Sequence, residues 1–589
     1  MKNQLEKAVL EVLADLGVTD AKIAIEHPED LNFGDYSTNA SLVASKKLGL
    51  NPRQTAEKIV EKLNAKNILQ VEKIEIAGPG FINFYLQADF FEIEVKNIPK
   101  LGKKYGSNDS RKGEKILIEY TDPNPFKQFH IGHLMSNSVG ETMSRFIAFA
   151  GAEVKRACYS GDVGLHVAKA IWGYQKLDQN YLAEKKDKVP VYDREVAMLS
   201  HDNEGAFWGL AYTFGSSEYD KEGAEKAEID QLNKVIFEGK DEEIMKLHKA
   251  GKAVSMKHFE EIFKKLGTKF DRYYFESEVV KDGLTIVTEN SKGIFEKSDN
   301  ATIFRGENYG LHTRVFVNSV GVPTYETKEL GLNTLKFKEN PNINQSIIIT
   351  AHEQSDYFKV VLKALSLIEP EVAEKTKHIS HGMLRFAGGK MSSRRGDVIT
   401  GESMISDVEE IATEKIKERV MTEEEKKKLA EIVAVGAIRY SILKQEAGKD
   451  IIFDFEKSLS FEGDSGPYLQ YTCVRAKSIV EKAKQAGVIG GFWNMFKTAK
   501  KAETEISRVE KIIYRFPEVV VRCQTEYSSH FMATYLIELS SEFNSYYANH
   551  KIVDKTEVTS PYRVAIAQAT AQVLENGLNL MGIEVPEKM

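Results

Sequence analysis

The sequence is poor in cysteine and has no long apolar run. Only three of the 589 residues are cysteine, Cys158, Cys473 and Cys523, and no two of them form a Cys-x-x-Cys pair. A zinc knuckle or disulfide framework is therefore not expected, and the three read as small buried residues. No run of about 18 apolar residues occurs, and residues 1–7 carry no apolar signal core. We expect a cytoplasmic protein without membrane segments.

The chain also lacks an excess of positive charge. Its net charge is −7, which by itself disfavours nucleic-acid binding, because phosphates are neutralised by Lys and Arg. The sum conceals local variation, since basic residues gather at 100–115 and acidic residues crowd 216–262. The basic stretch is either a solvated linker or a modest basic track, and both interpretations stay open.

The length and the residue patterns predict an enzyme of several domains. A content of 42% hydrophobic and 28% charged residues is typical of globular proteins, and 589 residues exceed a single core. Residues 1–107 read as a small α+β module. Residues 112–435 alternate strand-like and helical runs, which predicts a Rossmann-like, doubly wound parallel sheet with a helical insertion at about 175–265. From 436 to 589 the pattern is helical throughout, which predicts an all-α bundle.

Residues 124–133, Asn-Pro-Phe-Lys-Gln-Phe-His-Ile-Gly-His, form the most informative segment. They follow a strand-like run at 116–120, and helical periodicity begins directly after them. His130 and His133 would then flank Gly132 at a helix N-terminus, where unpaired N–H groups and the helix dipole favour phosphate. A short motif of this kind also occurs as two ordinary structural histidines.

A second segment supports a functional interpretation of the first. The mobile-looking basic stretch 388–396 contains Lys390, Met391, Ser392 and Ser393, and it lies 260 residues after His130 (390 − 130). Alone it could be a solvated turn. The two segments, in this order and at this separation, resemble the two signatures of class I aminoacyl-tRNA synthetases. The first matches fully, and the second departs at Ser393, where Lys is common.

Three acids indicate which amino acid such an enzyme would take. Glu119, Glu276 and Glu329 lie beside predicted strand ends, although each could be an ordinary surface acid. A guanidinium is planar and permanently charged, and it is matched by carboxylates, so an arginine site requires such acids.

The resemblance narrows to the arginyl-tRNA synthetases and covers nearly the whole chain. Its motifs are Phe33-Gly-Asp-Tyr36 with Gly78–Asn83, Gly161–Gly164, Gly466–Tyr471 and Asn576–Ile583. Three positions depart from the family pattern: Met135 replaces a usual Arg, Val163 a usual Trp and Glu329 a usual Asp.

The resemblance implies roles for particular residues. The catalytic residues would be His130, His133, Lys390, Ser392 and Ser393. The ATP-binding residues would be Asn124, His130, Gly132, His133, Gln354, Lys390 and Met391. The arginine-binding residues would be Glu119, Asn124, His130, Glu276, Tyr325, Glu329 and Gln354. The tRNA-binding residues would be Tyr36, Asn39, Gln470, Tyr471 and Arg475.

The implied activity is that of an arginine–tRNA ligase. It would activate L-arginine with ATP, accompanied by Mg²⁺, and transfer it to tRNA(Arg), as a monomer with no zinc and no metal site of its own. Alternatives are a class I synthetase for cysteine or methionine, whose zinc-binding cysteines are absent here, and a small nucleotidyltransferase, which would be shorter. A catalytically silent tRNA-binding paralogue is disfavoured because His130, His133 and Lys390 are intact.

Overall fold

The computed structural model describes residues 1–177, 204–221, 223–290, 293–386, 400–489 and 506–589. These residues form two compact units, each assembled from separate stretches of chain. The first unit comprises Met1–Tyr105, Thr472–Glu518 and Glu538–Asn576, and the second comprises Gly106–Tyr471, Val519–Ile537 and Gly577–Met589. Because both units draw on the C-terminal helices, they do not follow consecutive stretches of the chain. The domain limits expected from the sequence stay a prediction.

The N-terminal part is an α+β module with a four-stranded antiparallel sheet in the order β1-β2-β4-β3. Its elements are α1 (Lys2–Asp15), β1 (Ile25–Glu26), η1 (Leu31–Phe33), β2 (Tyr36–Thr38), α2 (Ala40–Leu48), α3 (Pro52–Lys66), β3 (Val71–Ala77), β4 (Phe81–Leu86), α4 (Ala88–Leu101) and η2 (Gly102–Lys104). The helical spacing of Leu5, Val9 and Leu13 places all three in the core. The alternating run 71–76 becomes β3, which pairs antiparallel with β4.

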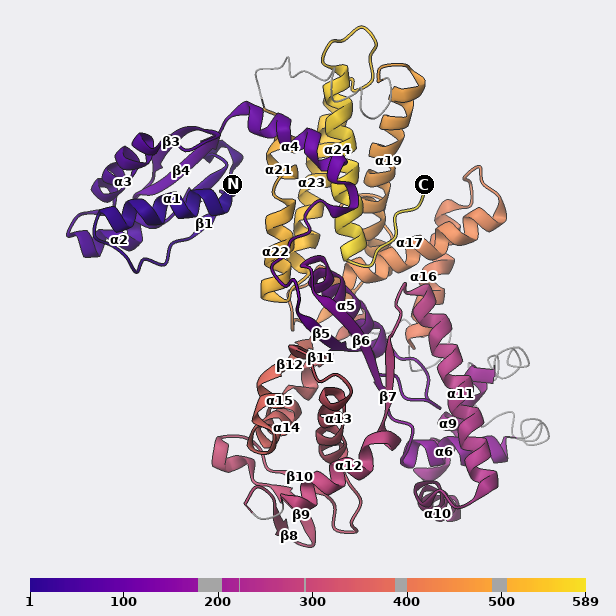
Figure 1. Ribbon diagram of the computed structural model, residues 1–589. Helices are drawn as coiled ribbons and strands as arrows, with labels where there is room; N and C mark the ends of the chain where they lie inside the picture. The colour runs from indigo at the N-terminus through magenta and orange to yellow at the C-terminus, as the bar shows by residue number, and fades with distance from the viewer. Residues whose placement is uncertain (178–203, 222, 291–292, 387–399, 490–505) are drawn as a thin grey trace. The chain divides into compact units, whose positions relative to one another are not determined.

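A five-stranded parallel sheet in the order β12-β11-β5-β6-β7 forms the centre of the second unit (Figure 1). Its elements are β5 (Lys115–Glu119), α5 (Ile131–Phe149), β6 (Glu153–Ser160), α6 (Leu165–Lys176), α9 (Glu204–Tyr219), α10 (Ala224–Glu238), α11 (Glu242–Lys265), β7 (Arg272–Phe275), α12 (Glu276–Glu289), α13 (Tyr325–Glu339), β11 (Gln345–Ala351), η4 (His352–Gln354), α14 (Ser355–Ile368), α15 (Pro370–Lys375) and β12 (Thr376–His381). The strands β5 and β11 are apolar on both faces, as helices on both sides require. The chain runs outward from β5 to β7 and then returns to β11, so the order reverses between β5 and β11.

Two expectations were wrong: that the strand-like runs of residues 112–435, among them 314–317, all join the parallel sheet, and that residues 436–589 are helical throughout. Arg314–Val317 is a strand, β10, but it belongs to a separate antiparallel sheet with β9 (Ala301–Phe304) and β8 (Glu296–Ser298). The short connection between β9 and β10, which contains η3 (Gly306–Tyr309), cannot hold the crossover that parallel pairing needs. The region after 436 is also not helical throughout, because β14 (Ile451–Phe453) pairs in parallel with β13 (Leu384–Phe386). A three-residue apolar run is too short for periodicity to distinguish strand from helix.

The other described elements from residue 401 onward are helices. Its helices are α16 (Gly401–Ile416), α17 (Glu423–Leu443), α18 (Phe455–Ser458), α19 (Gly466–Gln485), α21 (Arg508–Ile513), α22 (Phe516–Glu526), α23 (His530–Asn549) and α24 (Ser560–Leu580). The three cysteines are buried, as expected, and each has a free thiol. Among the described helices, none combines the length and apolar character needed to cross a membrane.

Candidate active site

A cavity of about 830 Å³ lies at the carboxyl ends of β5 and β11, where the strand order reverses. Open α/β sheets bind ligands at this topological switch point, and the volume suits a nucleotide with a small second substrate. Nine residues expected from the sequence line this one cavity: Glu119, Asn124, His130, Gly132, His133, Glu276, Tyr325, Glu329 and Gln354. They come from distant parts of the chain, and the sheet brings them together.

The two histidines begin helix α5. The backbone N–H of Gly132 donates to His130 Nδ1, and the backbone N–H of His130 donates to His133 Nδ1, each over 3.1 Å. Because each Nδ1 accepts a hydrogen bond, each neutral ring carries its proton on Nε2. The rings stack with their centroids 3.5 Å apart. Two Nε2–H donors beside a helix N-terminus form a site for phosphate oxygens.

The surroundings keep both rings neutral. Burial lowers the pKa of His133 well below its usual value, and the neighbouring His130 and Lys127 lower it further. Partial desolvation and the Lys127 ammonium likewise lower the pKa of His130. Neutral rings suit hydrogen-bond donation to phosphate, and they do not serve as fixed positive charges.

The first turn of α5 leaves no room for a larger residue at Gly132, and the loop before it contains strained backbone. A Cβ atom on Gly132 would lie 3.0 Å from His130 Cε1, so glycine lets the first ring keep its position. Thr121, Asp122 and Phe126 have positive φ angles of 80°, 50° and 70°. A left-handed conformation is unusual for a β-branched threonine, and such strain gathers at functional sites.

The three expected acids converge in the cavity from three elements. Glu119 ends β5, Glu276 begins α12, and Glu329 lies in the second turn of α13. Their exposed fractions are 2%, 4% and 5%. Acidic side chains are rarely this buried unless they are paired, so their partners determine what the site can bind.

Two of these acids have a lysine partner. Lys336 Nζ lies 2.6 Å from Glu119 Oε2, and Lys328 Nζ lies 2.6 Å from Glu276 Oε2. Within the described part of the chain, no ion pair is formed by Glu329. Its Oε1 atom accepts only a hydrogen bond, from an amide on the next turn of α13, over 3.0 Å.

A fourth acid, Asp122, joins this group and was not expected from the sequence. It lines the same cavity, and its Oδ1 atom accepts the backbone N–H of Tyr159 over 2.7 Å. Burial, with the nearby charge of Glu119, raises the pKa of Asp122 well above its usual value. Burial also raises the pKa of Glu329 to about 7, against the opposing effect of Lys336. Because Asp122 is held in its neutral form, Glu329 is the remaining carboxylate without an ion pair among the described residues, and it is available to one further cation.

Gly161 lies close to two of the expected residues, Asn124 and Glu276. Its N–H donates to Asn124 Oδ1 over 2.8 Å, and a Cβ atom there would lie 2.6 Å from the same oxygen and 3.2 Å from Glu276 Cδ. The next residue, Asp162, accepts the N–H of Ser277 over 2.9 Å and so holds the first turn of α12 against β6. The Gly-Asp pair therefore positions Asn124 and Glu276.

The second signature lies outside the described residues. Lys390, Met391, Ser392 and Ser393 all belong to that part of the chain, so their expected roles stay predictions. The chain that follows is joined to the histidine loop, because Thr400 forms a β-bridge with His130 and the N–H of Gly401 donates to Phe129 O over 2.7 Å. Thr400 and Gly401, which follow the second signature in the chain, therefore lie beside the first.

Two of the residues expected to bind tRNA are buried. Tyr36 is 1% exposed, and its hydroxyl donates to Glu518 Oε1 over 2.6 Å. Gln470 has no exposed surface, and its Nε2 atom donates to the carbonyl oxygen of Glu584 over 2.7 Å. A direct contact of either side chain with tRNA does not fit these positions, and we reassign both to packing. The resemblance located the motifs, but burial could not be read from them.

The other three expected tRNA contacts are partly exposed. Asn39 accepts the backbone N–H of Ala24 over 2.9 Å. Arg475 donates to Asn544 Oδ1 over 2.6 Å, and Tyr471 precedes it on α19. Their roles stay predictions.

Comparison with known proteins assigns the whole chain. Residues 94–455 match the model of the catalytic domain of class I tRNA synthetases (R), which defines the enzyme class. Residues 2–86 match the arginyl tRNA synthetase N-terminal domain, and residues 469–589 match the DALR anticodon-binding domain.

Individual relatives agree with these domain matches. The arginine–tRNA ligase of Clostridium kluyveri is 32% identical over 98% of this chain and 97% of its own length. That of Fusobacterium nucleatum is 32% identical over 95% and 94%. The structure of Thermus thermophilus arginyl-tRNA synthetase shares the fold, with a TM-score of 0.78, 23% identity and full coverage of both chains. The chain belongs to the arginyl-tRNA synthetases, and it attaches arginine to tRNA(Arg) at the expense of ATP.

Proposed function

We propose that the cavity at the switch point holds ATP and arginine together, with the phosphates at His130 and His133. This proposal depends chiefly on one observation, the convergence of nine expected residues on a single cavity. The two neutral rings offer Nε2–H donors at the N-terminus of α5. Donors fixed in this way stabilise the charge that develops on the phosphate oxygens without reorganising during the reaction.

The acidic end of the cavity binds the guanidinium of arginine. Glu119, Asp122, Glu276 and Glu329 surround this end. Glu119 and Glu276 each pair with a lysine, whereas Glu329 has no ion-pair partner among the described residues. A permanently charged guanidinium supplies the missing positive charge and accepts bidentate pairing. The half-buried Asn124 and the exposed Tyr325 and Gln354 lie along the same cavity and suit the α-amino group and adjacent ATP atoms.

The reaction then consists of two substitutions without a covalent enzyme intermediate. An oxygen of the arginine carboxylate attacks the α-phosphorus of ATP, the bond to the bridging oxygen breaks, and pyrophosphate leaves. The terminal ribose hydroxyl of tRNA next attacks the carbonyl carbon of arginyl-adenylate, loses its proton and releases AMP. The protein contributes by positioning the reactants and by stabilising charge.

Lys390, assisted by Ser392 and Ser393, neutralises the departing pyrophosphate. Mg²⁺ enters with ATP, because hard phosphate oxygens suit it and it rarely needs an all-protein cage. Within the described residues, no group of three or more His, Cys, Asp or Glu side chains is arranged to hold a metal ion. The absence of zinc, the monomeric state and the cytoplasmic location stay predictions.

Exchange of labelled pyrophosphate into ATP tests this assignment. We expect exchange that requires both arginine and tRNA(Arg), with no other amino acid replacing arginine. Exchange driven by another amino acid, or none with arginine and tRNA(Arg), would contradict it.

A pair of variants on helix α12 tests the acidic end. Glu276→Gln should raise the KM for arginine about 30-fold or more, because removing one partner of a buried ion pair costs about 2 kcal/mol or more. Glu289→Gln is the matched control, since Glu289 is exposed on the same helix. Equal KM values for the two variants would rule out the role of Glu276.

A further inference from the structure

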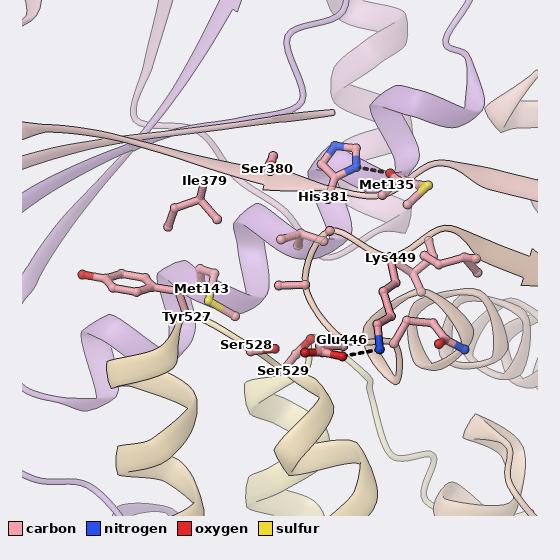
Figure 2. A pocket seen from close by; sticks show the side chains of 17 residues that line it. Met135, Met143, Ile379, Ser380, His381, Glu446, Lys449, Tyr527, Ser528 and Ser529 are labelled. Carbon is pink, nitrogen blue, oxygen red and sulfur yellow. Dashed lines mark hydrogen bonds and ion pairs between the residues drawn. The ribbon is translucent and has the colours of Figure 1, made fainter. Parts of the chain in front are cut away.

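A buried histidine outside the expected site residues lines the same cavity. His381 ends β12, where it pairs in register with Ala351 at the end of β11. Its side chain is 5% exposed. It also borders a second cavity of only about 30 Å³, too small for more than one or two water molecules. Figure 2 shows the His381 ring on the other side of its strand from Met143 and Ser529, which line this smaller cavity.

One ring nitrogen of His381 has no hydrogen-bond partner in the part of the chain that the structure describes. Nδ1 lies 2.7 Å from the carbonyl oxygen of Gly382 (Figure 2), and because a carbonyl can only accept, Nδ1 must carry the proton. Nε2 is then a bare acceptor. It is buried and has no hydrogen-bond partner among the described residues. Burial also lowers the pKa of His381, which keeps the ring neutral. A buried acceptor left unmet costs about 1–3 kcal/mol, so a donor from a ligand would be favoured there.

The cavity has two chemically different ends. Glu119, Glu276 and Glu329 lie on β5, α12 and α13, whereas His381 ends β12 and is followed in the chain by apolar lining residues. Apolar lining residues of the cavity include Ile349, Phe358, Met383 and Leu384. A guanidinium suits the acidic end, and the flat apolar faces of a purine base suit the other. The base of the nucleotide therefore lies where His381 offers its acceptor.

We propose that His381 Nε2 accepts a hydrogen bond from the 6-amino group of the adenine base of ATP and thereby selects adenine over guanine. The inference rests on the proposed nucleotide site and adds to it a residue that determines specificity. Guanine carries a carbonyl oxygen at the same edge, so two lone pairs would face each other. A site built to bond an N–H group discriminates strongly against a ligand without it, because its own polar atom is then left unpaired.

The test makes two changes separately: a nucleotide analogue lacks the 6-amino group, and a substitution removes the His381 acceptor from the protein. The nucleotides are ATP and purine riboside 5′-triphosphate, which differs from ATP only in lacking the 6-amino group. The proteins are the wild type, His381→Phe and His381→Gln, and kcat and KM are measured separately for arginylation of tRNA(Arg). We expect the wild type to lose tenfold or more in kcat/KM with the analogue, mostly through KM. His381→Phe should lose less than threefold, and His381→Gln, whose amide oxygen can accept, should keep most of the discrimination.

His378→Gln is the matched control on the same strand. His378 Nε2 is already bonded to Thr350 Oγ1 over 2.9 Å, and it does not line the cavity, so its variant should show the wild-type ratio between the two nucleotides. His381→Leu is a second variant without an acceptor, should the phenylalanine not fold. The proposal is overturned if the wild type has the same kcat/KM with both nucleotides. It is also overturned if kcat/KM falls by the same factor, from ATP to the analogue, in the wild type and in both acceptor-free variants. A wild type inactive with ATP would instead contradict the proposed function.

Discussion

We predict that the carboxyl group of Glu329 makes arginine binding dependent on pH. Burial raises its pKa to about 7, so the group is mostly protonated at pH 6 and mostly ionised at pH 8. A carboxylate stabilises a guanidinium, and a neutral carboxylic acid does so far less. Arginine is therefore expected to bind more tightly as the pH rises through 7, and binding below that pH should release a proton.

The size of the effect follows from the ionised fraction. With a pKa of about 7, this fraction is about 0.09 at pH 6 and about 0.91 at pH 8. If arginine binds only the ionised form, its apparent Kd falls about tenfold between these values, or about 1.4 kcal/mol. In Glu329→Gln the titrating group is gone, so we expect weaker binding at pH 8 and a nearly flat pH dependence.

Calorimetric titration with arginine at pH 6, 7 and 8 measures both consequences. Two buffers with different ionisation enthalpies reveal the proton released at pH 6, and Glu289→Gln serves as the control with an exposed acid on a neighbouring helix. A pH-independent Kd in the wild type would refute the reasoning. An equal dependence of the arginine Kd on pH in Glu329→Gln would also refute it. The titration would then be assigned to Asp122, whose pKa is likewise raised by burial.

The same pKa shift has a consequence for stability. The folded protein binds a proton at Glu329 more strongly than the unfolded chain, whose pKa would be near the ordinary 4.5. The stabilisation from this group is therefore complete below pH 4.5 and is lost as the pH rises to about 7. Urea unfolding measures the free energy of unfolding of the wild type and of Glu329→Gln between pH 5 and 8. We expect the free energy of the variant to rise relative to that of the wild type as the pH increases.

Three further variants test other parts of the site. Lys390→Ala should lower the rate of adenylate formation about 10²-fold or more, on the scale of one lost transition-state donor, and an unchanged single-turnover rate would refute its role. Gly132→Ala should displace the His130 ring, because the new Cβ would lie 3.0 Å from Cε1; we expect a lower kcat with an unchanged thermal midpoint. Lys336→Met leaves the Glu119 carboxylate buried without its partner, which should cost about 3–5 kcal/mol in urea unfolding, and a loss below 1 kcal/mol would show that the pair contributes little.

The sequence predicted the part of the site that is contiguous in the chain. His130, Gly132 and His133 follow an apolar strand and begin a periodic helix, so local pattern was sufficient to place them. The acids Glu119 and Glu276 were found because the carboxyl ends of parallel strands meet at one edge.

The sequence did not reveal which groups pair inside the cavity. Lys336 and Glu119 are 217 positions apart (336 − 119), and no local pattern indicates that they form an ion pair. Asp122 was missed because a loop acid after a strand resembles any surface residue. The burial of Tyr36 was likewise invisible, since its hydroxyl is bonded to Glu518, which is distant in the chain.

The sequence by itself determined the family, the parallel-sheet fold and nine of the residues around the cavity, because these depend on local periodicity and on motifs that stay close together in the chain. Only the tertiary structure decided the charge balance of the cavity, the neutral state of its histidines and the free acceptor of His381. These properties depend on burial and on partners from distant segments, since desolvation and ion pairing arise only when the chain is folded.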